Sequence, residues 1–214
     1  MKTLLYKQFR LLCHPMTLIF CLFGAMVLIP NYPYSVTFFY VTLGLFFTFL
    51  NMREQKDIYY SALLPIRKRD AVKAAMVFTV FIELLSVVIT ALFCLLSARI
   101  QPGKDNAVGM DGNFMLLGVG FLLYAVFNLV FFTSLYRSGY KVGAAYVKAN
   151  VALWPLMAVA EAVVHFPGLE WLNRVDLQAN LRQIPILVVG ALSFAGLSIA
   201  AYERAAALYE KVDL

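Results

Sequence analysis

Long apolar runs separated by short polar segments dominate the order of residues along this chain. A membrane-spanning helix needs about 20 mostly apolar residues, with a range of about 17 to 25. The runs do not alternate as membrane β-strands do, so they favour helices, which satisfy their own backbone polar groups inside lipid. Six stretches approach or meet this length, and the first is short for a complete span. The predicted spans are Met16 to Pro30, Tyr34 to Met52, Val72 to Ser97, Phe114 to Tyr136, Val147 to Val164 and Ile184 to Ala201.

Residues 1–13 precede the first span and carry an amphipathic pattern. Thr3, Lys7 and Arg10 fall on one helical face, and apolar side chains fall on another. This pattern predicts an interfacial helix on the membrane surface. A plain basic anchor ahead of the first span fits the same residues nearly as well.

Two longer connections also stand out between the spans. Residues 53–71 form the longest connection on the side of the termini, with a potential helix of two or three turns ended by Pro65. Residues 165–183 form an amphipathic segment on the other side, in which Trp171 suits a membrane interface.

The distribution of lysine and arginine predicts the orientation. Three of these residues precede the first span, six lie between Arg53 and Lys73, three between Arg137 and Lys148, and two in the tail, which places 14 of 18 on one side. Only four lie in the alternate loops. Basic residues concentrate in cytoplasmic loops, so both termini are expected inside the cell.

Composition supports a membrane environment. Of the 214 residues, 62% are hydrophobic and 14% are charged, whereas a soluble domain is about half apolar and about a quarter charged. We therefore expect an all-α polytopic membrane protein, with residues 1–214 forming a single transmembrane domain. The net charge of +6 is divided among short clusters between apolar runs, which indicates topology and not nucleic-acid binding.

No pattern in the chain indicates an enzyme site. The two histidines, His14 and His165, are predicted on opposite sides of the membrane, and no Cys-x-x-Cys occurs. The only Gly-Lys pair is followed by Asp105, so the chain has no P-loop for ATP. We therefore predict no catalytic, cofactor-binding or metal-binding residues, and we interpret the three cysteines as packing residues.

Polar side chains inside the predicted spans are candidates for function, because a charge at mid-bilayer costs about 2.5 to 3.5 kcal/mol on insertion scales. Glu83 lies deep in the third span, where a proton-coupling or substrate-pathway carboxylate and a buried structural carboxyl are equally compatible with the sequence. Glu161 lies close to the outer end of the fifth span, where it can snorkel, and this favours a structural role. Asn128 is more typical of a hydrogen bond between helices than of a ligand.

Small residues recur at four-residue spacing in the sixth predicted span. Ala191 pairs with Ala195, and Gly196 pairs with Ala200. Such pairs let helices approach closely, either within one subunit or between subunits.

Two segments together carry a resemblance to a known family. Residues 1–12, MKTLLYKQFRLL, look like the amino-terminal interfacial helix of ABC-2 type transporter permeases. Residues 62–73, ALLPIRKRDAVK, are similar to the stretch of this family that combines Leu-Pro, a hydrophobic residue and basic residues between the second and third helices. The six-span plan and the outer segment before the last helix agree with the same family.

The resemblance implies a permease subunit that dimerises with an identical or related copy and docks two copies of a separate ABC ATPase, which binds and hydrolyses ATP. The ATPase-coupling element of the family maps onto Lys56 to Arg69 here, where basic residues equally suit topology and contact with anionic lipid. Compact members of this family export peptides, antimicrobials or other amphipathic compounds, often across the plasma membrane of bacteria. The residues that this mapping assigns to coupling are Tyr59, Tyr60, Leu64, Pro65, Arg67, Lys68 and Arg69.

Two other functions remain compatible with the sequence. One is a proton-coupled secondary transporter that uses Glu83, although such proteins often contain paired repeats, and none is evident here. The other is a membrane protein that moves no substrate, such as an immunity or assembly protein. The ATP-driven exporter is the preferred hypothesis.

Overall fold

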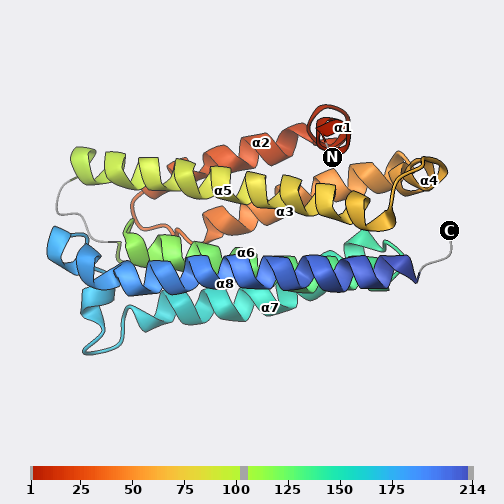
Figure 1. Ribbon diagram of the computed structural model, residues 1–214. Coiled ribbons are helices and arrows are strands. Elements are labelled where there is room, and N and C mark those ends of the chain that lie inside the picture. Colours follow the sequence, from red (N-terminus) through yellow and green to blue (C-terminus); the bar gives the residue numbers. More distant parts are fainter. Residues whose placement is uncertain (1, 102–105, 212–214) are drawn as a thin grey trace.

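Long helices run side by side through the structure, a computed structural model that describes residues 2–101 and 106–211 (Figure 1). Five of them are long and apolar enough to cross a membrane. The described residues contain no β-strand, which confirms the all-α prediction. The five helices are α3 (Val36–Glu54), α5 (Lys68–Ile100), α6 (Phe114–Arg137), α7 (Val142–Val163) and α8 (Leu177–Glu210).

The chain begins with a bent pair of shorter helical segments. α1 (Lys2–Lys7) continues into a π-helical turn, η1 (Gln8–Leu12), and α2 (Pro15–Cys21) continues into a 3-10 helix, η2 (Leu22–Leu28). The two halves meet at an angle of 90°, so Figure 1 shows α1 end-on beside the bundle. Counted as one broken span, the pair raises the number of spans to six.

Local chemistry explains the position of the bend between η1 and α2, and helix geometry explains the length of the α2–η2 segment. The His14 side chain accepts a hydrogen bond from the Met16 backbone N–H, and Pro15 occupies the first helical position, so a new helix starts there. A 3-10 helix rises about 2.0 Å per residue against about 1.5 Å in an α-helix. The seven α-helical and seven 3-10 residues therefore extend roughly 24 Å, which brings a short sequence closer to the thickness of the bilayer core, about 30 Å.

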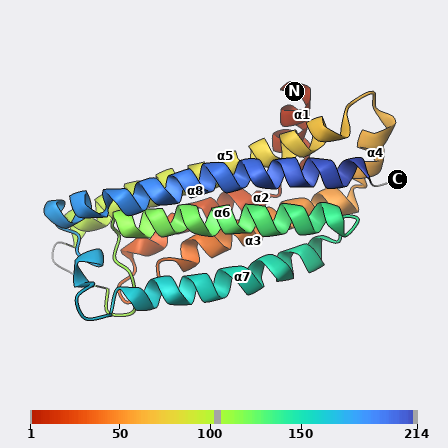
Figure 2. The same cartoon turned by 60° about the horizontal axis from the view of Figure 1, so that its bottom comes forward.

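Both termini lie at one end of the bundle, together with α4 (Asp57–Leu63), as Figure 1 shows. The turn before α3, residues 106–113 and the connection that contains η3 (Glu170–Leu172) lie at the opposite end. In Figure 1 and Figure 2, α7 follows one edge of the bundle, with α6 between it and α5. This arrangement agrees with the alternation predicted from the basic residues.

Three helices extend further than the hydrophobic runs predicted. α5 begins at Lys68 instead of Val72, α7 begins at Val142 instead of Val147, and α8 begins at Leu177, inside the predicted outer segment 165–183. The 33 residues of α5 span roughly 50 Å, more than the bilayer core of about 30 Å. Hydropathy identifies only the part of a helix that lies inside lipid, so it does not predict the polar residues by which a helix extends beyond the membrane.

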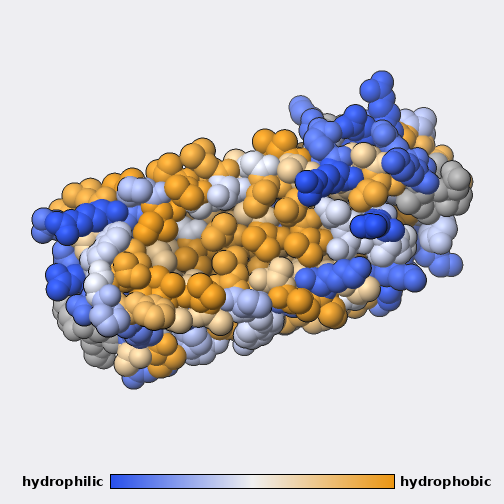
Figure 3. All heavy atoms as spheres, turned by 90° about the horizontal axis from the view of Figure 1, so that it is seen from below, coloured by the Kyte–Doolittle hydropathy of each residue, from blue (hydrophilic) through white to orange (hydrophobic). Residues whose placement is uncertain are grey.

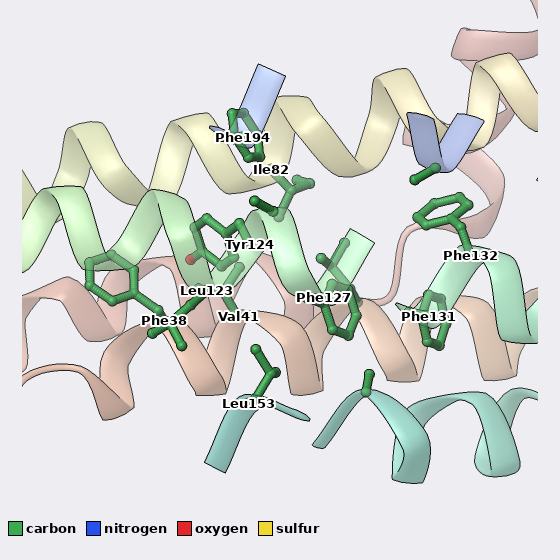
Figure 4. Close-up of a cluster of buried hydrophobic side chains, with 14 of the residues drawn as sticks. Phe38, Val41, Ile82, Leu123, Tyr124, Phe127, Phe131, Phe132, Leu153 and Phe194 are labelled. Atoms are coloured by element: carbon green, nitrogen blue, oxygen red, sulfur yellow. The ribbon is translucent and has the colours of Figure 1, made fainter. Parts of the chain in front are cut away.

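α6 forms the centre of the bundle because its sequence is apolar on all sides. It packs most extensively against α8 and α7. Figure 4 shows that its aromatic side chains fill the space between neighbouring helices. Among them, Phe127 stacks on Phe131 with 4.9 Å between ring centroids, and Phe131 meets Phe49 of α3 edge-on at 5.1 Å.

The surface carries a broad apolar belt between two polar ends, as Figure 3 shows. Large apolar side chains of the long helices, such as Val151, Leu95 and Leu192, are more than half exposed. A soluble protein rarely exposes so large a continuous apolar surface, whereas lipid tails solvate it. The belt therefore supports the prediction of an integral membrane protein.

α6 and α8 cross at two glycines, Gly118 and Gly190. A Cβ built on Gly190 would overlap the Gly118 carbonyl oxygen, so only glycine allows this approach. The small-residue pairs predicted from the sequence do not provide it, because Ala195 and Gly196 are exposed and Gly196 has open space around it. The close contact uses Gly190 instead, whose neighbours four residues away, Ile186 and Phe194, are large, so it is not a pair of the predicted kind.

Candidate functional site

The predicted coupling segment forms a short helix and a turn at the end that carries both termini. α3 ends at Glu54, and Lys56, with a left-handed backbone (φ 52°), redirects the chain into the seven residues of α4. Leu64 then takes an extended conformation, and α5 starts four residues later, at Lys68. Residues 64–67 thus connect α4 to a helix that is continuous to Ile100.

One face of α4 is fixed to the amino-terminal helix. The Lys7 ammonium lies 2.8 Å from an Asp57 carboxylate oxygen and donates a hydrogen bond of 2.9 Å to the Ser61 hydroxyl. The predicted polar face of residues 1–13 is thus divided, since Lys7 faces α4 while Thr3 and Arg10 remain exposed. The π turn that starts at Gln8 interrupts the regular period of about 3.6 residues on which the predicted faces depended.

The other face of α4 is exposed and apolar. The exposed fractions of Tyr59, Tyr60 and Leu64 are 61%, 65% and 52%, as expected for contact residues in the coupling segment. Leu63 is 82% exposed, although it is not among the predicted coupling residues. The spacing of four residues between Tyr59 and Leu63, which puts both on one face of a helix, was the signal that could have found it.

The three consecutive basic residues of this segment have different surroundings. Arg69 forms an ion pair with Glu203 of α8 and lies 3.9 Å from a Glu210 carboxylate oxygen. The Lys68 ammonium lies 5.7 Å from the centre of the Tyr209 ring, also on α8. Arg67, which precedes α5, is exposed. Lys68 and Arg69 therefore attach α5 to α8, and Arg67 is the one of the three that is presented outward.

Two of the predicted intramembrane polar residues lie together. The Asn128 amide of α6 donates a hydrogen bond of 2.8 Å to the Glu83 carboxyl of α5 and one of 3.1 Å to the Ser198 hydroxyl of α8. All three side chains are buried. Next to them, the Ser86 and Tyr124 hydroxyls are hydrogen-bonded at 2.6 Å. Ser198, Ser86 and Tyr124 were missed, because an isolated hydroxyl in an apolar run gives little signal until the helices are packed.

The cluster leaves two oxygen atoms without a donor among the described residues. These are the second carboxyl oxygen of Glu83 and the amide oxygen of Asn128. An unpaired buried acceptor costs free energy. One additional hydrogen between the Glu83 and Asn128 side chains would satisfy both oxygens. Protonation of Glu83 would supply that hydrogen, because a carboxylic acid and a carboxamide can exchange two hydrogen bonds.

Glu161 lies apart from this cluster, at the opposite end of the bundle from α4. Its two carboxylate oxygens accept hydrogen bonds from the backbone N–H groups of Ser35, at 3.2 Å, and Met110, at 2.7 Å. Ser35 immediately precedes α3, so the carboxylate also lies near the positive end of that helix. Glu161 therefore holds α7, the start of α3 and residues 106–113 together, where the sequence predicted a snorkelling side chain.

The described residues contain no group of three or more histidine, cysteine, aspartate or glutamate side chains placed to hold a metal ion. What they bring together is an exposed contact surface at one end, a polar cluster across three helices, and an apolar belt for lipid.

Comparison with known proteins agrees with this arrangement. Residues 3–209 match a family model described as ABC-2 family transporter protein, which leaves only the two ends of the chain outside the match. No curated protein and no solved structure matches the chain. The family match covers the α4 segment and, apart from one residue each of α1 and α8, all of the other helices, so the resemblance seen in two short segments extends through the bundle. The chain therefore belongs to the ABC-2 family of transporters, as a membrane-spanning permease component.

Proposed function

We propose that the chain is the permease of an ATP-driven exporter and that α4, with the residues around it, receives the movement of a separate ABC ATPase. Membership of the family implies association with such an ATPase. The observation that carries the proposal is the two-sided construction of α4. Its inner face is fixed by Lys7, and its outer face presents Tyr59, Tyr60, Leu63 and Leu64.

A docking surface needs exposed anchors on a supported element. Tyrosine is enriched at the energetic centres of protein interfaces, and the leucines add apolar area beside it. Arg67 adds an exposed charge at the edge of the same surface, where it can meet a carboxylate of the partner. Closure of an ATPase dimer would then displace α4, and α5 would carry that displacement into the bundle.

The interior of the bundle supports a second copy of the permease. Aromatic side chains of α6 and α3 fill the centre (Figure 4), so a passage inside one copy would require several of them to move. A passage between two copies needs no such rearrangement. We therefore propose a complex of two permeases and two ATPases in the plasma membrane of a bacterial cell, exporting peptides, antimicrobials or other amphipathic compounds.

The buried Glu83–Asn128–Ser198 cluster is the observation that would favour a proton-coupled secondary transporter. All three residues also hydrogen-bond three helices to one another, which is a structural role in itself. Neither this function nor that of an immunity or assembly protein explains the exposed face of α4. The family match favours the ABC permease over both.

Site-specific photo-cross-linking in native membranes tests the proposal. A photoreactive amino acid at Leu63 should capture a protein that contains an ABC ATPase domain, identified by mass spectrometry. The same probe at Val108, which is 49% exposed at the opposite end, is the matched control and should capture none. Capture of the ATPase from both positions, or from neither, would contradict the assignment of α4.

A further inference from the structure

A second feature lies beside α4, where a pocket of about 260 Å³ opens between the α3–α4 turn and the α6–α7 turn. Three cationic side chains line it, Arg53, Lys56 and Lys141. Its remaining walls include the aromatic rings of Tyr136, Tyr140 and Tyr209. No aspartate or glutamate lines this pocket, so all of the charged side chains in its walls are cationic.

The three cations have no carboxylate partner among the described residues. Lys7 and Arg69, which form ion pairs with carboxylates, do not line the pocket. Burial raises the pKa of the Tyr140 phenol well above its usual range, so Tyr140 is neutral at physiological pH and adds no negative charge. Like charges that converge on one space repel each other, and an anion in the pocket removes this repulsion.

The backbone around the pocket favours the same ligand. Two residues that line the pocket, Lys56 and Tyr140, have left-handed backbone conformations, with φ angles of 52° and 67°. Residues other than glycine adopt this conformation at a cost in free energy. Such costs tend to persist at functional sites. Lys141 also precedes α7 without a side-chain cap, so a cation lies at the positive end of a 22-residue helix. This combination is unfavourable alone and favourable once an anion is bound.

The position of the pocket indicates the source of that anion. Arg53 lies in the last turn of α3 and Lys141 lies just before α7, so the pocket is at the level where two spans leave the hydrocarbon. α7 follows the edge of the bundle (Figure 2), and its Val147 and Val151 are 62% and 70% exposed. Phosphate groups of phospholipids lie at this level, with acyl chains along the adjoining apolar helix surface.

We propose that this pocket binds the phosphate group of an anionic phospholipid from the leaflet on the α4 side. Tyr59 of α4 also lines the pocket, so the bound headgroup contacts the element assigned to coupling. The lipid would then bridge α3, α4 and the α6–α7 turn and restrict the movement of α4. This second step depends on the coupling role of α4, whereas lipid binding itself does not.

Native mass spectrometry of the purified chain in neutral detergent measures the binding directly. The chain is titrated with short-chain phosphatidylglycerol or phosphatidylcholine, and the bound lipid is counted. We expect preferential binding of phosphatidylglycerol. The variant Arg53→Gln with Lys141→Gln should weaken this binding roughly 25-fold, or about fivefold for each lost cation.

Arg10→Gln with Lys73→Gln is the matched control, because it removes two exposed cations that do not line the pocket. This control should leave the preference unchanged. Lys141→Arg keeps the positive charge and should retain binding, which separates loss of charge from loss of fold in the pocket variant. An equal loss in the control, or no preference between the two lipids, would overturn the proposal. Competition by inorganic phosphate as strong as that by the lipid would assign the pocket to a free anion. Since no ATPase is present, these results do not depend on the proposed function.

Discussion

The Lys7 ammonium and the Asp57 carboxylate form an ion pair of 2.8 Å that joins the first helix of the chain to α4. The side chains are only 21% and 12% exposed, so water screens the pair less than it would at an open surface. Ser61, one turn further along α4, accepts a second hydrogen bond from Lys7. Two contacts of one lysine therefore join the amino-terminal helix to α4, although 50 residues separate Lys7 from Asp57.

Lys7→Met should detach α1 from α4 and lower the stability of the purified chain. Loss of a hydrogen-bonded charge leaves Asp57 partly buried without its partner, which costs about 1.5–3 kcal/mol. Thermal unfolding in detergent measures this, with Lys2→Met as a control at an exposed lysine of the same helix. If Asp57→Asn costs as much in the Lys7→Met background as in the unchanged chain, the two residues are not coupled.

Arg67→Glu and Arg69→Glu should differ in kind. Arg69→Glu places a third carboxylate beside Glu203 and Glu210, so it should lower the free energy of unfolding slightly, by about 1 kcal/mol or less, and Glu203→Arg should restore it. Arg67→Glu should leave the unfolding temperature unchanged and reduce cross-linking of the ATPase at Leu63. A stability loss from Arg67→Glu that matches the loss from Arg69→Glu would show that the two arginines are equivalent.

The helices and their order were predictable because hydrophobic length and basic loops are strong, local signals. The bend at His14 and the 3-10 segment Leu22–Leu28 were not, because they depend on a cap and on close packing against α3 and α5. The predicted pairs of small residues do not form the crossing of α6 and α8. The identity of the crossing glycines, Gly118 and Gly190, depends on how α8 is rotated, which one sequence does not specify.

The candidate site was predictable in position but not in detail. The α4 segment carried a recognisable pattern, whereas the division of labour among Arg67, Lys68 and Arg69 depends on residues of α8 more than 130 positions away. Glu83 and Asn128 were selected separately, and only the packed helices bring them to 2.8 Å. Ser198 completes that cluster and could not have been chosen from the other serines in apolar runs.

Glu83→Gln should preserve the cluster, whereas Glu83→Ala should disrupt it. A carboxamide at this position accepts the hydrogen bond from Asn128 and can donate one to the Asn128 oxygen, which now lacks a donor. Alanine leaves a cavity and an unpaired amide, at a cost of about 2–4 kcal/mol. Thermal unfolding of the two variants decides the matter. Equal losses would show that Glu83 is needed as a charge and not as a hydrogen-bonding partner.

Gly190→Ala should destabilise the contact between α6 and α8. The added Cβ would lie 3.0 Å from the carbonyl carbon of Gly118, and backbone atoms on both helices leave no side chain that could move aside. Overpacking of this kind costs about 1–3 kcal/mol. Gly196→Ala is the matched control, because it lies on the same helix with open space around it and gains up to about 1 kcal/mol of helix propensity. Thermal unfolding should therefore move in opposite directions for the two variants, and a shared direction would mean that α8 is rotated differently against α6.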